Sequence, residues 1–182
     1  MARRAPAPEA PPRKAGAASA DTAGPLEDAW RIFDARHLPY RVLMLGKMLD
    51  RLTAQQVREQ AGLSLAEWRV LVHLAVMGAK SASEVSAAAL VDRAEVSRAV
   101  RTLEASGYLH RADNPRNRKS SLLALTPSGQ AIYDDVHMQR RVFYEALTAG
   151  LTSDALAMLD GSLLHMARNA DRLAREWAST GS

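Results

Sequence analysis

Three helix-start signals follow one another closely in the middle of the chain, and they constrain its fold more than any other feature. Ser64, Ser81 and Asp92 each stand three residues before a glutamate, the spacing of a capping box. Starts this close together leave room only for short helices, predicted over about 65–77, 82–89 and 93–106. Short helices need neighbours to bury their apolar faces, so the spacing predicts a compact helical unit.

A longer helix is predicted on each side of this unit. Before it, leucine and valine residues recur every three or four positions from Leu38 to Leu52, which predicts a helix over about Tyr40–Ala61 that ends at Gly62. After it, Thr126 can cap a helix that starts with Pro127 and runs to about residue 149.

The final helix, which begins near residue 152 or 153, carries an apolar seam. Its apolar positions step alternately by three and four residues, at Leu156, Leu159, Leu163, Met166, Ala170, Leu173 and Trp177. This average period of 3.5 is typical of a helix that packs along another helix. The alternative is packing on the chain's own core, but the length of the seam favours an interface between two copies of the chain. A homodimer held by its first and last helices is therefore predicted.

Only one region reads as extended structure. Residues 108–111 and 121–125 are candidate strands, and the polar segment between them contains Asn114-Pro115. The pattern predicts a two-stranded hairpin with a long basic tip. The expected fold class is thus mainly α with one small β-hairpin.

The first 24 residues contain nine alanines and four prolines, and they lack Leu, Ile, Val and aromatic residues. Such a segment cannot bury enough apolar surface to become ordered, so a disordered tail is predicted. No apolar stretch follows Arg3 and Arg4, which argues against a secretory signal and for a cytoplasmic protein. The expected divisions are 1–24 (tail), 25–62 and 127–182 (dimerisation helices) and 63–126 (the capped helices with the hairpin).

Composition removes several classes of function. The chain has no cysteine, which excludes disulfides, cysteine-ligated metals and thiol-based redox switching. Its five histidines are scattered, and no sequence motif of a hydrolase, metalloprotease or nucleotide-binding enzyme is present. No uncharged stretch is long enough to span a membrane. We therefore expect a protein that is not an enzyme, uses no cofactor and binds no metal or membrane.

The positive charge is concentrated on the third capped helix and the hairpin. Residues 93–119 hold seven basic and three acidic side chains, an excess equal to the net charge of +4 of the whole chain. On the helix, Val96, Val100 and Leu103 share one face, so small and basic residues occupy the other. A short helix, a turn, a helix with a basic face and a basic hairpin form the arrangement of a winged helix-turn-helix that reads double-stranded DNA. The predicted DNA-binding residues are Arg93, Ala94, Ser97, Arg98, Arg101, Arg111, Arg116, Arg118 and Lys119.

From about Leu38 to Trp177, the sequence resembles the multiple-antibiotic-resistance regulator (MarR) family of bacterial transcription factors. The carriers of the resemblance are Gly62-Leu63-Ser64, Trp68-Arg69-Val70-Leu71, Val96-Ser97-Arg98-Ala99-Val100, Leu103-Glu104, Gly107-Tyr108-Leu109, Leu125-Thr126 and Gly129. The resemblance implies a dimer with one winged helix in each subunit, a pseudo-palindromic operator and, most often, repression. One position departs from the family, whose hairpin usually carries Asp-x-Arg where this chain has Asn117-Arg118-Lys119. Asn117 cannot form an ion pair, so a less firmly fixed hairpin tip is expected.

The resemblance also implies a small effector, often an aromatic carboxylate or a phenol, which binds between the dimer helices and the winged helix and releases DNA. The candidate effector-binding residues are His37, Arg41, Met44, Met48, Trp68, His73, Tyr133 and His137. Ordinary core packing is the competing interpretation of these side chains. Two alternatives to an effector-controlled regulator stay open: a DNA-binding dimer that acts constitutively or under a protein partner, and a helical adaptor whose basic hairpin meets an acidic surface.

Overall fold

The computed structural model describes residues 25–31, 37–115, 117 and 119–180. The chain divides into two compact units, Met1–Leu49 and Asp50–Ser182. The segment predicted to be a disordered tail lies outside the described residues. Within the described part of the chain, no helix has the length and apolar character needed to cross a membrane.

The first unit contains a helix that the sequence pattern did not predict. This helix, α1 (Pro25–Arg31), precedes α2 (Leu38–Ala61), which begins slightly before the predicted residue and ends where predicted. Gly62 follows α2 with a positive φ of 67°, and its amide donates to the carbonyl oxygen of Arg58. The N-terminal half of α2 belongs to the first unit and its C-terminal half to the second.

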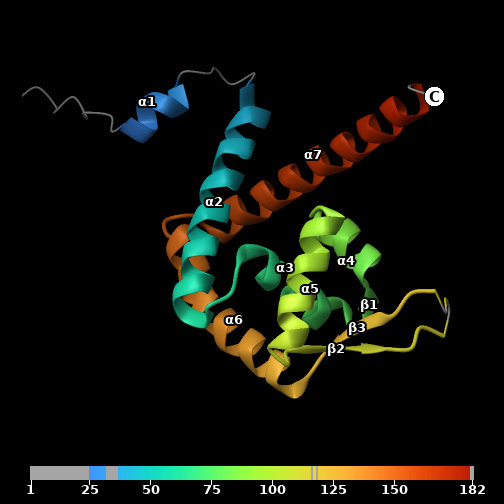
Figure 1. The fold of residues 1–182 in the computed structure, drawn as a ribbon. Coiled ribbons are helices and arrows are strands. Elements are labelled where there is room, and N and C mark those ends of the chain that lie inside the picture. The colour runs from blue at the N-terminus through green and yellow to red at the C-terminus, as the bar shows by residue number, and fades with distance from the viewer. Residues whose placement is uncertain (1–24, 32–36, 116, 118, 181–182) are drawn as a thin grey trace, which may run out of the picture. The chain divides into compact units, whose positions relative to one another are not determined.

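The three capped helices form as predicted. They are α3 (Leu65–Met77), α4 (Ala82–Ala89) and α5 (Arg93–Ala105) (Figure 1). Ser64 and Ser81 both complete the reciprocal hydrogen bonds of a capping box. Asp92 caps α5 in a different way, because its carboxylate accepts from the amide of Ala94 at 2.7 Å.

The predicted two-stranded hairpin is present as β2 (Leu109–Ala112) and β3 (Leu122–Leu125), and a short third strand that the sequence did not predict, β1 (Lys80–Ser81), completes the sheet. The strands lie in the order β1-β3-β2, and both pairs are antiparallel. β1 has only two residues and adjoins the cap of α4, so no alternation of apolar and polar residues could reveal it. Figure 1 shows the β2–β3 hairpin extending beyond α3, α4 and α5.

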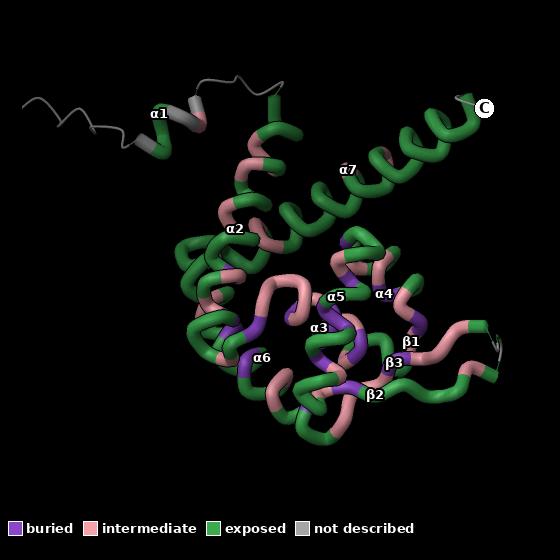
Figure 2. Tube along the Cα trace, viewed as in Figure 1, coloured by how far each residue is buried: buried purple, intermediate pink, exposed green. Residues whose placement is uncertain are grey.

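One core holds α3, α4, α5 and the sheet together. The fully buried side chains come from every one of these elements and from α2 and α6: Val57, Val70, Leu71, Val85, Val96, Val100, Leu103, Leu123 and Val136. The buried stripe of α5 contains the residues that its periodicity predicted. Because one face of α5 is used in this core, the opposite face stays accessible (Figure 2).

Two long helices complete the second unit. α6 (Pro127–Leu147) starts at the predicted cap, where the Thr126 hydroxyl accepts from the amide of Gly129 at 3.0 Å, and it ends slightly before the predicted residue. α7 (Ser153–Thr180) begins at the predicted position and has no buried residue (Figure 2). Five of its seven seam residues are exposed in the single chain: Leu159, Leu163, Ala170, Leu173 and Trp177.

Candidate nucleic-acid interface

The free face of α5 presents the side chains that the sequence predicted. Ala94, Ser97, Arg98 and Arg101 are all exposed. The Arg101 side chain lies back along the helix, with Nε 3.4 Å from the carbonyl oxygen of Ser97. A narrow helix face with small residues and two arginines is suited to a DNA major groove, where guanidinium groups can donate two hydrogen bonds to one guanine.

Arg93 links α5 to the helix before it. Its Nη2 atom donates to Oγ of Ser83 on α4 at 2.6 Å. The guanidinium is exposed and lies at the first turn of α5, where its charge faces solvent. This hydrogen bond fixes the start of α5 against α4. The role of Arg93 in DNA binding stays a prediction.

Arg111, on β2, is exposed and forms an ion pair with a carboxylate on α5. Its Nε and Nη2 donate to the two carboxylate oxygens of Glu104 at 2.7 and 3.0 Å, and its Nη1 donates to Oγ of Ser121 at 3.1 Å. Each of the three nitrogens of the guanidinium therefore already has a partner. The DNA-binding role predicted for Arg111 stays a prediction, and no local pattern in the sequence indicated this pairing.

The hairpin tip is organised by two asparagines. The Asn114 side chain donates to Oγ of Ser120 at 3.0 Å and accepts from the amide of Asn117 at 3.2 Å. Oδ1 of Asn117 accepts from the amide of Lys119 at 3.1 Å. Hydrogen bonds of two neutral amide side chains thus organise the described part of the tip.

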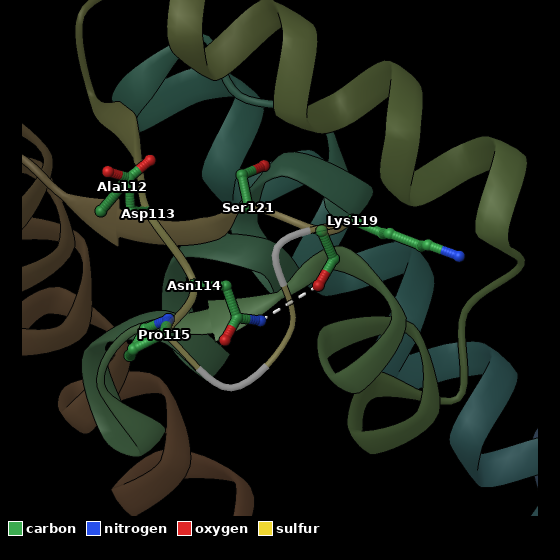
Figure 3. Close-up of a pocket in the computed structure, with 7 residues that line it drawn as sticks. Ala112, Asp113, Asn114, Pro115, Lys119 and Ser121 are labelled. Carbon is green, nitrogen blue, oxygen red and sulfur yellow. Dashed lines mark hydrogen bonds between the residues drawn. The ribbon is translucent and has the colours of Figure 1, made fainter.

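Lys119 is exposed at this tip. Figure 3 shows its side chain pointing away from a polar cavity of about 640 Å³ at the base of the loop, which Asp113, Asn114 and Pro115 help to line. Arg116 and Arg118, also predicted to bind DNA, lie outside the described residues. Among the described residues of the tip, Lys119 is the side chain that offers a positive charge to a ligand.

Four of the predicted effector-binding residues lie in the first unit. His37 is exposed, and Arg41, Met44 and Met48 are half-buried. A cavity of about 460 Å³ is lined by Met48 and by four residues that the sequence analysis did not name: Leu26, Glu27, Trp30 and Leu45. The Arg41 guanidinium carbon lies 5.6 Å from the centre of the Trp30 ring. The spacing of four residues between Leu26 and Trp30 is the signal that could have indicated this apolar face.

In the second unit, three of the predicted residues form a continuous aromatic stack. Trp68 is buried and stacks on Tyr133 with ring centroids 5.8 Å apart, and Tyr133 stacks on His137 at 5.3 Å. His73 is not part of the stack, and its Nδ1 lies 2.7 Å from the carbonyl oxygen of Arg69. The stack joins α3 to α6, which is a core role, and a role in effector binding stays a prediction.

Arg140 on α6 is a buried cation that the sequence analysis missed. Its side chain, only 4% exposed, donates to Thr53 and Gln56 on α2 at 3.1 and 3.0 Å and to the hydroxyl of Tyr144 at 2.8 Å. Its guanidinium carbon also lies 4.9 Å from the centre of the Tyr144 ring. The helical stripe that contains Gly129 and Val136 passes through position 140, so the period of α6 carried a signal of burial.

The central part of the chain is similar to proteins of known family. The model of the MarR family matches residues 61–120. The multiple antibiotic resistance protein MarR of Salmonella typhimurium is 26% identical over 120 residues, which are 65% of this chain and 83% of the relative. MarR of Escherichia coli is 25% identical over 118 residues, with 64% of this chain and 81% of the relative covered.

Solved structures show the same fold. Apo wild-type MarR from E. coli superimposes with a TM-score of 0.61 at 25% identity, over 71% of this chain and 95% of that one. A MarR-family regulator from Silicibacter pomeroyi gives a TM-score of 0.63 at 26% identity, over 71% and 89%. A mutant MarR from E. coli complexed with operator DNA is similar in fold, with a TM-score of 0.59 at 22% identity, over 74% and 99%.

Proposed function

The chain belongs to the MarR family of transcriptional regulators, and from this membership we propose that it binds operator DNA as a homodimer. It is a regulator and not an enzyme. The single observation that carries the proposal is the exposed face of α5, on which Ser97, Arg98 and Arg101 stand free of the core that the opposite face fills. A mutant MarR protein of similar fold has been solved in complex with operator DNA, which supports DNA as the ligand of this chain.

In the proposed complex, α5 lies in the major groove and the hairpin, or wing, reaches the neighbouring minor groove. Arg98 and Arg101 are placed to read base edges, while Lys119 at the wing tip contributes charge toward phosphates. A dimer brings two such helices to half-sites about one helical turn apart. In this complex, α5 recognises the base sequence. The wing recognises the DNA backbone or the shape of the minor groove.

The experiment that tests this proposal compares two DNA duplexes of equal length. Fluorescence anisotropy is measured at near-physiological salt with DNA from upstream of the protein's own gene and with a scrambled duplex. We expect a preference on the order of 10³-fold for the genomic DNA. If a selection from genomic DNA also finds no preferred site, the proposal fails and the adaptor alternative takes its place.

Replacement of Arg98 or Arg101 by alanine is expected to weaken binding to the operator by about 1–3 kcal/mol, if that arginine holds a base edge. It should also relax sequence preference at one position in each half-site, which a set of single-base operator variants measures. Arg141→Ala is the matched control, because it removes an exposed arginine of α6 that pairs with Glu145 on the same helix. If both variants keep the sequence preference of the wild type, α5 does not recognise the operator sequence.

The homodimer is proposed from the α7 seam. Leu159, Leu163 and Leu173 are 49%, 41% and 39% exposed in the single chain, although they repeat at the period of a helix–helix interface. Leu163→Glu is expected to raise the dimer dissociation constant by roughly 30-fold or more, because a charge would enter the dry centre of the interface. Sedimentation over a concentration series measures this shift, and circular dichroism verifies that the helices persist. A dimer that is as tight as the wild type would exclude the seam from the interface.

We also propose that the regulator is a repressor released by a small aromatic acid or phenol. The cavity beside Met48 and Trp30 is lined by four apolar side chains and by one acid, Glu27. The Arg41 guanidinium near the Trp30 ring is a charge that suits a carboxylate. Titration of aromatic acids into the protein–DNA complex tests this, with Trp30→Ala as the variant that should lose the response. If no aromatic acid releases the DNA but a protein partner does, the alternative of control by a protein partner is favoured.

A further inference from the structure

The most specific polar contact between α5 and the wing is the fork formed by Glu104, Arg111 and Ser121. Both carboxylate oxygens of Glu104, in the last turn of α5, accept from Arg111 at 2.7 and 3.0 Å. The same guanidinium donates to Ser121, which precedes β3, at 3.1 Å. One side chain thus joins the end of α5 to both arms of the hairpin, and we name this group the fork.

The fork lies where the hairpin leaves the core. On β2, Leu109 is buried, whereas His110, Arg111 and Ala112 are exposed. The outer part of β2 is thus exposed, and its pairing with β3 and the fork are described contacts that hold it. A bidentate guanidinium–carboxylate pair has a fixed planar geometry, so it can hold an angle that a single contact could not.

We propose that Arg111 is a positioning residue and not a DNA contact: with Glu104 and Ser121, it sets the angle between the wing and α5 so that both meet DNA together. This inference rests on the proposed DNA binding. The positive charge of Arg111 is already balanced by Glu104, and three of its five N–H groups, one on each nitrogen, donate within the protein. A phosphate placed beside this pair would also face the Glu104 carboxylate.

The direction in which Glu104→Gln changes the affinity for the operator distinguishes a positioning role of the fork from a purely electrostatic effect. Glu104→Gln removes a negative charge close to the DNA surface, so electrostatics alone predicts tighter binding. If the fork positions the wing, the same change weakens operator binding, by roughly 5- to 20-fold. Arg111→Lys keeps the charge but loses the planar fork, and we expect it to weaken operator binding to a similar degree. The double variant Glu104→Gln/Arg111→Lys should be no weaker than either single variant, because both remove the same interaction.

Glu145→Gln is the matched control, since it removes an exposed acid from another surface ion pair on α6. We expect that control to bind the operator as the wild type does. The slope of log affinity against log salt should stay unchanged in Arg111→Lys, and in Arg111→Ala it should not fall by the ~0.9 that a lost phosphate contact would cause. Operator binding by Glu104→Gln that equals or exceeds that of the wild type would overturn the proposal.

A measurement without DNA keeps the inference separate from the proposed function. Hydrogen exchange of the β2 and β3 amides is followed in the free protein, and we expect roughly tenfold faster exchange in Glu104→Gln but not in Glu145→Gln. Unchanged exchange in Glu104→Gln would overturn the fork as a positioning device. If the wild-type protein shows no operator preference, the proposed function fails, while the exchange result still decides whether the fork holds the wing.

Discussion

Replacement of Gly129 by alanine is expected to lower the free energy of unfolding by about 3 kcal/mol or more. A Cβ atom at this position would lie 1.8 Å from the carbonyl oxygen of Tyr108 and 2.8 Å from its carbonyl carbon. Both are backbone atoms, so α6 would have to move away from the start of the wing. That movement would also break the cap in which the Thr126 hydroxyl accepts from the Gly129 amide.

Urea unfolding, followed by circular dichroism, measures this loss. Gly161→Ala on α7 is the matched control, because a Cβ there meets no atom within 4 Å and position 161 lies opposite the seam. The control should gain up to about 1 kcal/mol, since alanine favours the helix more than glycine does. A Gly129→Ala protein that is as stable as the wild type would show that α6 does not depend on this close approach.

Replacement of Arg140 by alanine is expected to cost about 3 kcal/mol of stability. The change removes hydrogen bonds to Thr53, Gln56 and Tyr144, and it leaves a space where a 96% buried side chain packed between α2 and α6. No carboxylate among the described residues pairs with this guanidinium, so the charge is held by neutral oxygens and by the faces of Phe143 and Tyr144.

Arg140→Met separates the packing from the charge. Methionine retains much of the volume and removes the cost of burying a cation, so we expect a loss of about 1 kcal/mol or less. Thr53→Val, by contrast, leaves the cation in place and removes one of its acceptors, and should cost about 1–3 kcal/mol. Thermal unfolding of the three variants ranks their losses of stability. An Arg140→Ala protein that loses less stability than Arg140→Met would contradict this prediction.

Local signals predicted the helical part of the fold well because the determinants are near in sequence. The capping residues Ser64 and Ser81 act on amides three positions away, and the buried stripe of α5 follows from its own period. The residues of α5 on the face opposite this buried stripe are small or basic, so the stripe also predicts the exposed basic face. These features needed no knowledge of the rest of the chain.

Contacts between distant segments account for what the sequence missed. β1 exists because Lys80 and Ser81 pair with β3, some 40 residues later. Glu104, which pairs with Arg111, and Thr53 and Gln56, which accept from Arg140, lie on other elements, so no local pattern indicated these contacts. The cavity beside Met48 likewise required α1, whose short pattern is not sufficient to predict a helix.

Residues a few positions apart account for the order of the capped helices, the basic face of α5, the apolar seam of α7 and the resemblance to the MarR family. Which charges are available to a ligand depends instead on contacts between distant segments. A guanidinium is free or engaged according to the oxygens that folding brings to it, and in this chain folding brings Glu104 to Arg111 and Thr53 to Arg140.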